Sequence, residues 1–87
     1  MLPLSRLPLG RTARVMELNA SRPVDQRLLA LGLVPGMRVK LVRVAPLGDP
    51  IAIEFHNQCV SLRRAEAAGI LVEAEPATRA ERGTGRD

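Results

Sequence analysis

The stretch LLALGLVPGMRVKLVRV, residues 28–44, changes from a helical to an alternating pattern of apolar side chains. On its N-terminal side, Val24, Leu28 and Leu31 recur at positions i, i+4 and i+7, which is the spacing of a helix with one buried face. On its C-terminal side, valine and leucine alternate with arginine and lysine, which is the spacing of a strand. We therefore expect a helix over residues 23–31, followed closely by a strand.

Both ends of the expected helix carry local signals. Ser21 is placed to cap its first turn, and Asp25 complements the positive end of the helix dipole. After the last turn, Gly32 supplies a left-handed residue and Leu33 is placed to fold back onto the helix, as in a Schellman motif. The Pro35–Gly36 pair then turns the chain into the next strand.

Alternating apolar residues predict five short strands. The alternation changes phase within two of them, around Met16 and around Val42, so we expect bulged or sharply coiled strands there. A tight hairpin is expected at Asn57–Gln58, and a short helical turn over residues 63–69 precedes the last strand. The predicted strands cover residues 12–19, 37–44, 51–57, 59–63 and 70–75.

This arrangement predicts an all-β fold: a small SH3-like barrel of about five strands with one short helix inserted after the first strand. An OB-type barrel is the alternative, although such a barrel normally has longer strands and a helix later in the chain. The barrel is expected to occupy residues 1–75. Residues 76–87 contain no large apolar side chain and are expected to form a disordered tail.

The composition is that of one small soluble domain. Of the 87 residues 46% are apolar, and Phe55 is the single aromatic residue, so we expect an aliphatic core. Cys59 is the single cysteine, which excludes an intrachain disulfide and fits a reducing compartment. No uncharged apolar stretch is long enough to cross a bilayer, and the N-terminus lacks the pattern of a signal peptide. We therefore expect a cytoplasmic protein with no direct membrane insertion.

The sequence offers no set of residues for catalysis. No serine has a recognisable base partner, and no glycine-rich phosphate loop is present. His56 and Cys59 flank the expected hairpin and, with Glu54, are weak candidates for a metal site. Because a zinc site needs about four ligands, one chain does not supply a complete set. We expect no enzyme activity, no metal site within one chain and no cofactor.

A formal net charge of +4 raises nucleic acid as a partner. Arg38, Lys40 and Arg43 lie along one expected strand, where they are placed to contact phosphates. The basic residues are interspersed with acidic ones, however, and Phe55 alternates with isoleucines on the expected inner face instead of forming a stacking platform. An RNA-binding barrel is therefore the alternative function, and nucleic acid is the disfavoured partner.

Two turns are rich in apolar residues, and a contiguous apolar surface would indicate a protein partner. In APLGDP, residues 45–50, we expect Gly48, Asp49 and Pro50 to hold the turn while Leu47 contacts the partner. The other predicted contacts lie at the helix end and in the turn that follows it: Leu29, Leu33, Val34 and Pro35. A homo-oligomer formed through the same turns is a further alternative.

In their order and spacing, these motifs resemble the FeoA family, the small cytosolic component of bacterial ferrous-iron uptake. The similarity covers about residues 4 to 75 and comprises a leading leucine repeat, the helix end with its Pro-Gly turn, the Gly-Asp-Pro turn and a Leu-Arg-x-x-Glu-Ala run. The matching residues are Leu4, Leu7, Gly10, Leu28, Leu29, Leu31, Gly32, Leu33, Pro35, Gly36, Gly48, Asp49, Pro50, Leu62, Arg63, Glu66 and Ala67.

The resemblance implies an SH3-like barrel that binds or regulates FeoB, a membrane ferrous-iron transporter with a cytoplasmic GTPase domain. It assigns no metal role to His56 or Cys59. Arg27, beside the Leu28–Leu29 pair, is a candidate to reach the partner's nucleotide site, although a solvated helix charge is the simpler interpretation. The predicted function is that of a non-enzymatic accessory protein that supports or regulates iron uptake at the inner face of the membrane.

Overall fold

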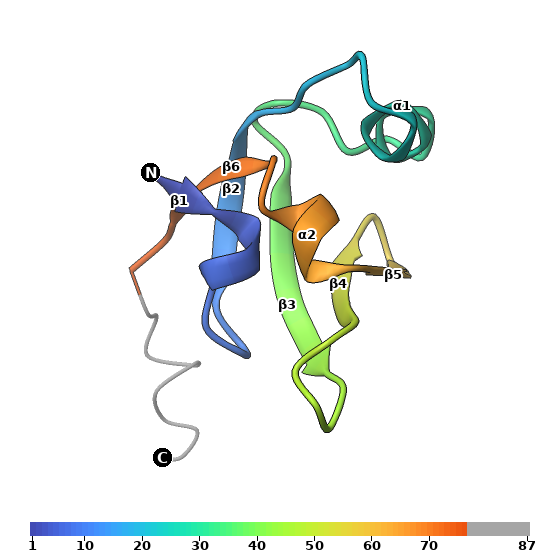
Figure 1. The fold of residues 1–87 in the computed structure, drawn as a ribbon. Helices are drawn as coiled ribbons and strands as arrows, with labels where there is room; N and C mark the ends of the chain where they lie inside the picture. The colour runs from blue at the N-terminus through green and yellow to red at the C-terminus, as the bar shows by residue number, and fades with distance from the viewer. Residues whose placement is uncertain (77–87) are drawn as a thin grey trace.

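Six strands form one antiparallel sheet in a computed structural model that describes residues 1–76 of the chain (Figure 1). The order across the sheet is β1-β6-β2-β3-β4-β5. The strands are β1 (Leu2–Pro3), β2 (Thr12–Glu17), β3 (Arg38–Val44), β4 (Ile51–Phe55), β5 (Gln58–Leu62) and β6 (Leu71–Ala74). The helices are the short 3-10 helix η1 (Leu4–Arg6), α1 (Pro23–Ala30) and α2 (Arg64–Ala67).

Two further sequence-based expectations concern membrane-spanning helices and the C-terminal tail. No helix among the described residues has the length and apolar character needed to cross a bilayer. The predicted tail comprises residues 76–87, and all of it from residue 77 onward lies outside the described residues.

Two bulges occur where the sequence pattern changes phase. β2 shifts its register against β6 between Val15 and Glu17, and β3 shifts against β4 between Leu41 and Arg43. Because a bulge adds one residue to one strand, the side chains on its two sides alternate in opposite phase. The irregularities predicted around Met16 and Val42 are therefore confirmed.

The core is aliphatic apart from Phe55, as the composition predicts. It receives side chains from the sheet, from all three helices and from the turn after α1. The buried apolar residues that pack together are Leu4, Leu7, Ala13, Val15, Leu28, Leu33, Val39, Leu41, Ile51, Ile53, Phe55, Leu62, Ala67, Ile70 and Val72.

The N-terminal segment covers one side of this core, and the sequence pattern did not predict it. β1 pairs with β6, and the N–H of Leu4 at the start of η1 donates to the Ile70 carbonyl at 2.8 Å. Leu4 and Leu7 are both buried. The sheet consequently has six strands in place of the predicted five, and α1 follows the second of them.

α1 is confirmed, although its ends and its buried face differ in part from the prediction. The Ser21 hydroxyl donates to the Asn19 side chain at 2.6 Å and makes no capping bond, so the prediction of Ser21 as the cap is wrong. Leu28 is buried as expected, whereas Leu31 is 39% exposed. The helix instead turns the fully buried Asp25 inward, because polar groups beside this carboxylate satisfy it.

The β4–β5 hairpin turns one residue earlier than predicted. Its two turn residues have positive φ angles, 53° for His56 and 59° for Asn57, as a two-residue type I′ turn requires. Phe55 pairs directly with Gln58 across the turn. This register keeps Phe55 in the core, so long-range burial decides the position of the turn.

Candidate functional site

α1 ends in the predicted Schellman motif. Gly32 has a φ of 105°, and its N–H donates to the Leu29 carbonyl at 3.0 Å. The N–H of Leu33 donates to the Leu28 carbonyl at 2.9 Å, and the Leu33 side chain is fully buried. A side chain without exposed surface does not contact a partner, so the predicted partner contact of Leu33 is wrong.

The turn that follows is fastened to β2. Gly36, with a φ of 93°, donates its N–H to the Val15 carbonyl at 2.7 Å. The Arg14 guanidinium donates to the Gly36 carbonyl at 3.0 Å. These bonds hold Val34 and Pro35 at the surface, where Val34 is 41% exposed. This turn therefore presents a small apolar surface on a fixed backbone.

The turn between β3 and β4 is held by polar contacts and exposes its apolar tip. Gly48 has a φ of 91°, and its N–H donates to the Ala45 carbonyl at 2.7 Å. Asp49 Oδ1 accepts the N–H of Arg64, the first residue of α2, at 3.0 Å, and the Arg64 guanidinium also donates to the Gly48 carbonyl. Leu47, at the tip, is 96% exposed. The turn presents this leucine without packing it against the protein.

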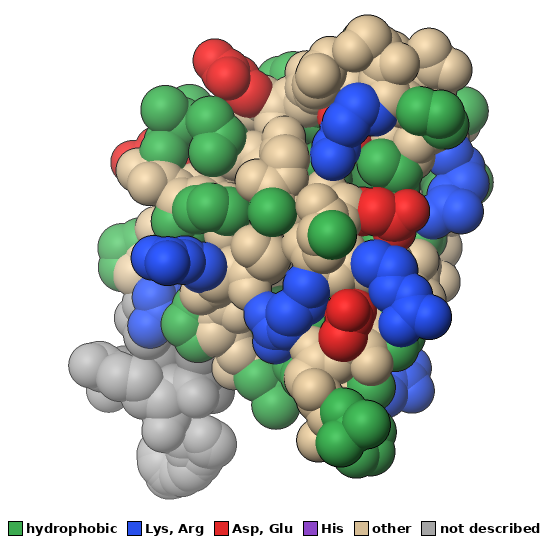
Figure 2. Space-filling view, viewed as in Figure 1, with side chains coloured by type: hydrophobic (Ala, Val, Ile, Leu, Met, Phe, Trp, Pro, Cys, Tyr) green, Lys and Arg blue, Asp and Glu red, His purple; other side chains and the backbone are tan. Residues whose placement is uncertain are grey.

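The two apolar turns lie at opposite ends of β3 (Figure 1). The seven residues of that strand span about 23 Å at ~3.3 Å per residue. Figure 2 shows one apolar surface over the β3–β4 turn and, separated from it, other apolar side chains near α1. Leu29, on α1, is half-buried and belongs to the end of β3 where Val34 and Pro35 lie. Pro50 lies in the β3–β4 turn, at the other end, and follows a cis peptide bond. The predicted contacts therefore form two separate surfaces, not one continuous patch.

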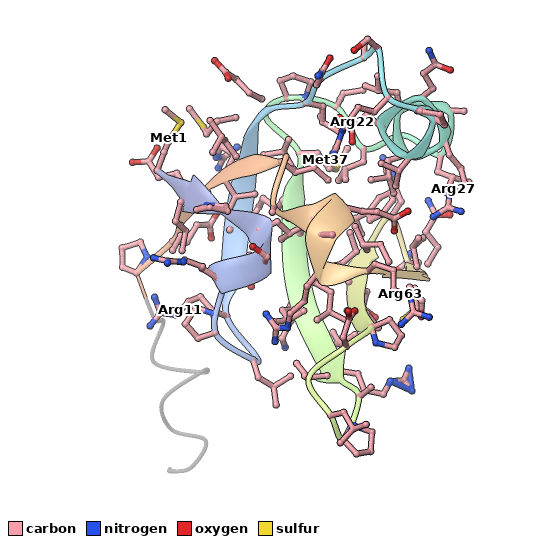
Figure 3. All side chains as sticks on the ribbon, in the orientation of Figure 1. Met1, Arg11, Arg22, Arg27, Met37 and Arg63 are labelled. Carbon is pink, nitrogen blue, oxygen red and sulfur yellow. The ribbon has the colours of Figure 1, made fainter. Side chains whose placement is uncertain are left out.

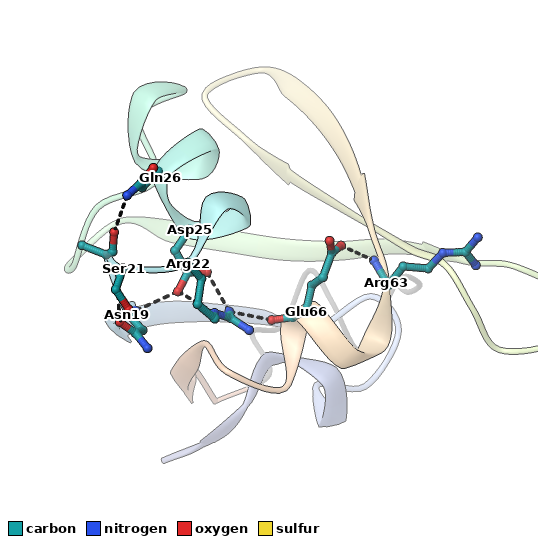
Figure 4. A network of polar contacts seen from close by, with 8 residues as sticks. Asn19, Ser21, Arg22, Asp25, Gln26, Arg63 and Glu66 are labelled. Atoms are coloured by element: carbon teal, nitrogen blue, oxygen red, sulfur yellow. Dashed lines mark hydrogen bonds and ion pairs between the residues drawn. The ribbon is translucent and has the colours of Figure 1, made fainter.

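A buried carboxylate joins α1 to α2 (Figure 4). Asp25 accepts the Asn19 N–H at 2.8 Å and two bonds from the Arg22 guanidinium, at 2.7 and 3.1 Å. The same guanidinium donates to the Glu66 carbonyl at 2.9 Å. The hydrogen bond to Asp25 raises the pKa of Arg22 above its ordinary value. A Cβ at position 69 would lie 2.7 Å from the Arg22 guanidinium, so Gly69 leaves room for this contact.

Sequence reasoning missed this network. It assigned Asp25 to the helix dipole, and nothing local to α1 indicates that Glu66, 44 residues after Arg22, supplies the carbonyl that completes the arrangement. One signal was available in the sequence. Asp25 directly follows Val24 of the predicted buried face, and a charged side chain that is buried needs a partner. The network is structural, and it fixes α1 relative to α2.

The metal candidates Glu54, His56 and Cys59 are divided between the strands and the turn of one hairpin. Glu54 and Cys59 face each other across β4 and β5, and the Arg43 guanidinium lies 3.9 Å from the Cys59 sulfur. His56 lies in the turn, where its ring lies 3.1 Å from where a Cβ of Gly32 would be. Within residues 1–76, no three or more histidine, cysteine, aspartate or glutamate side chains are placed to hold a metal ion.

The basic residues of β3 lie among acidic ones. Arg38 donates two hydrogen bonds to the Glu75 carboxylate, at 3.0 and 2.8 Å, and Lys40 pairs in register with Glu54. Phe55 is 3% exposed, and the sequence has no tryptophan or tyrosine, so no phenylalanine, tyrosine or tryptophan face is available for a base to stack on. This surface therefore does not favour the RNA-binding alternative.

The sequence matches one protein family over nearly the whole of the described part. Residues 2–74 match the family model described as the FeoA domain. A fusion of Fe(2+) transport protein A with the Fe(2+) transporter FeoB, from Porphyromonas gingivalis, is 37% identical over 70 residues. Those residues are 80% of this chain and 8% of the fusion protein, so the chain corresponds to a small part of that relative.

Solved structures agree in fold. The solution structure of the FeoA protein of Chlorobium tepidum is 36% identical, with a TM-score of 0.77 that covers 98% of this chain and 90% of that one. The crystal structure of Stenotrophomonas maltophilia FeoA complexed with zinc, described as an SH3 domain protein, is 32% identical. Its TM-score is 0.71, over 84% of this chain and 91% of that one. The predicted SH3-like fold is confirmed.

Proposed function

The chain belongs to the FeoA family, and we propose that it binds the cytoplasmic, GTPase-containing part of a FeoB-like transporter and regulates Fe²⁺ uptake. Family membership implies involvement in Fe(2+) transport. The observation that supports FeoB as the partner is the Porphyromonas gingivalis fusion protein, because it joins a relative of this chain and FeoB in one polypeptide. On this proposal the protein works at the cytoplasmic face of the membrane through its partner, without catalysing a reaction itself.

Leu47 supports a docking role for the β3–β4 turn. A leucine that is 96% exposed loses the benefit of burial, which amounts to about 1.5–3 kcal/mol for a full side chain. The turn beneath it is held by Gly48 and by the contacts of Asp49 and Arg64, so little conformational freedom is lost on binding. Leu47 is therefore our first choice for the central contact.

The surface at the other end of β3 supplies a second group of proposed contacts. Val34 and Pro35 are exposed at the turn, and Leu29 is half-buried nearby on α1. A partner that touches both ends has to cover the length of β3, about 23 Å. A single protein-protein interface of ordinary size is wide enough for this.

Calorimetric titration with the purified cytoplasmic domain of the transporter tests the proposal. We expect binding by the natural protein and about a tenfold loss of affinity for Leu47→Ala, because a buried leucine contributes that order of free energy. Met16→Ala is the matched control, since Met16 is a partly exposed apolar residue at the β2 bulge. Absence of binding by the natural protein, together with unchanged Fe²⁺ uptake in cells that lack it, would contradict the proposal.

A further inference from the structure

The two edges of the sheet differ in their capacity to accept another strand. At one edge, β1 is two residues long and ends in Pro3, which has no N–H to donate. At the other edge, β5 has five residues and no proline. Within residues 1–76, no strand pairs with the outer side of β5. An edge of this length without a blocking feature is a template for strand addition.

The hairpin register shows which peptide groups face outward from β5. Phe55 and Gln58 flank a two-residue turn, so they exchange hydrogen bonds with each other, and every second residue of β5 does the same with β4. The residues between them, Cys59 and Ser61, direct their N–H and carbonyl groups away from β4. Both residues are exposed, and no described residue bonds to these peptide groups.

Two hollows lie beside this edge, and Pro50 and Ser61 border both of them. Arg43, Ala52 and Ser61 are neighbours in register, so their side chains share the outer face, where they border a hollow of about 290 Å³. Leu62 points to the core face, where it borders a hollow of about 220 Å³ together with Arg27. Successive side chains of an added strand point to opposite faces, so they would enter the two hollows in turn.

Arginines border both hollows. Arg27 from α1 and Arg63 after β5 border the one on the core face, and Figure 3 shows Arg27 extending from α1 toward the side where Arg63 lies. Arg43 borders the other hollow. None of the three forms an ion pair with a described residue, and the carboxylate of the nearby Glu66 already accepts the Arg63 N–H at 2.8 Å. Three arginines without an ion pair therefore border the hollows, beside the carboxylate of Glu66 at the core-face hollow and that of Glu54 opposite Cys59.

We propose that the β5 edge binds an extended, acidic segment of a protein partner as an added strand. The outward peptide groups of Cys59 and Ser61 bond the backbone of that segment. Carboxylates on adjacent residues of the segment reach Arg27 and Arg63 on one face and Arg43 on the other. The segment need not belong to the protein that contacts Leu47, so this proposal and the proposed function fail separately.

A capped eight-residue peptide of alternating threonine and valine, with two glutamates at its centre, is the probe. Titrated into the full-length ¹⁵N-labelled protein, it is expected to shift the amide resonances of β5 and to slow hydrogen exchange at Cys59 and Ser61. The same peptide with glutamines in place of the glutamates is expected to bind several-fold more weakly. Shifts absent from β5, or equal affinity for the two peptides, would overturn the proposal.

Surface variants distinguish a loss of peptide affinity caused by a missing charge from one caused by misfolding. Arg27→Gln and Arg63→Gln are each expected to weaken the acidic peptide about threefold, the order of a partly exposed ion pair. Arg6→Gln is the matched control, because Arg6 is an exposed arginine in η1, away from β5. Ser61→Pro removes one outward N–H and is expected to abolish peptide binding. If this variant does not fold, the affinities of the arginine variants still test the proposal.

Three further outcomes complete the test. If the β5 resonances shift with protein concentration alone, the occupant is a second copy of this chain and the acidic-segment proposal is wrong. If the peptide does not bind while the transporter domain still does, the β5 proposal fails and the proposed function stands. Equal effects of Arg6→Gln and Arg63→Gln would indicate a general response to net charge and would also contradict the proposal.

Discussion

The turns at the two ends of β3 look alike in composition and differ in what holds them. In the turn after α1, Leu33 is fully buried and the backbone is bonded to α1 and β2. In the turn before β4, Leu47 is 96% exposed and the backbone is held by Asp49 and Arg64. An apolar residue in a turn can therefore be buried in the core, as Leu33 is, or remain exposed, as Leu47 is.

The largest expected difference between the turns is in stability. Leu33→Ala is expected to lower the free energy of unfolding by about 3 kcal/mol, because it removes buried methyl groups and leaves a cavity. Urea denaturation followed by circular dichroism measures it. Leu47→Ala serves as the paired control, since it removes the same atoms from an exposed position. Comparable losses for the two variants would mean that Leu47 packs against the protein.

The glycines of the two turns are expected to differ next. Gly32→Ala should cost about 2 kcal/mol, since the left-handed conformation strains alanine by ~1–2 kcal/mol and the new Cβ would lie 3.1 Å from the His56 ring. Gly48→Ala carries the same conformational cost but meets only the Arg64 side chain at 4.0 Å, so about 1 kcal/mol is expected. Thermal unfolding of both variants gives the ranking, and a larger loss at Gly48 would reverse it.

A smaller effect is expected from the polar contact that holds the second turn. Asp49→Ala leaves the Arg64 N–H without its side-chain acceptor, and we expect a loss of about 1 kcal/mol because solvent replaces part of an exposed hydrogen bond. The free energy of unfolding from denaturant titration is the readout. Asp49→Asn keeps an acceptor oxygen and should recover most of the loss; failure to recover would show that the contact does not depend on hydrogen bonding.

The smallest effect on stability is expected at the exposed tip. Leu47→Ala should change the free energy of unfolding by less than about 0.5 kcal/mol, as surface substitutions usually do. The same variant is expected to lose transporter binding about tenfold, so stability and binding separate at this residue. Light scattering adds a check, because a fall in mass on this substitution would show that the turn joins copies of this chain.

Features set by neighbours in sequence were predicted well. The helix over residues 23–30 and its Schellman ending depend on residues within one or two turns, and both are confirmed. The strand bulges follow from a phase change that the alternation itself contains. The resemblance to the FeoA family, built from these motifs in order, is confirmed by the match over residues 2–74.

Features that need a distant partner were not predicted. β1 is two residues long and carries no strand pattern, so its pairing with β6 is visible only in three dimensions. The burial of Asp25 depends on Arg22 and on a carbonyl of α2, and the hairpin turn moves by one residue to keep Phe55 in the core. Leu33 was assigned both the fold-back contact of the Schellman motif and a partner contact, and its complete burial leaves the first of these.

The sequence by itself determined the class of fold, the positions of the two strand bulges and the glycine turns on either side of β3, because backbone preferences and periodicity act over a few residues. Only the tertiary structure decided which apolar turn residue is buried. It also separated the two apolar surfaces to opposite ends of β3 and made β5 an edge strand that no strand within residues 1–76 covers. Exposure and contiguity are properties of packing between segments, and packing is the information that a linear pattern does not carry.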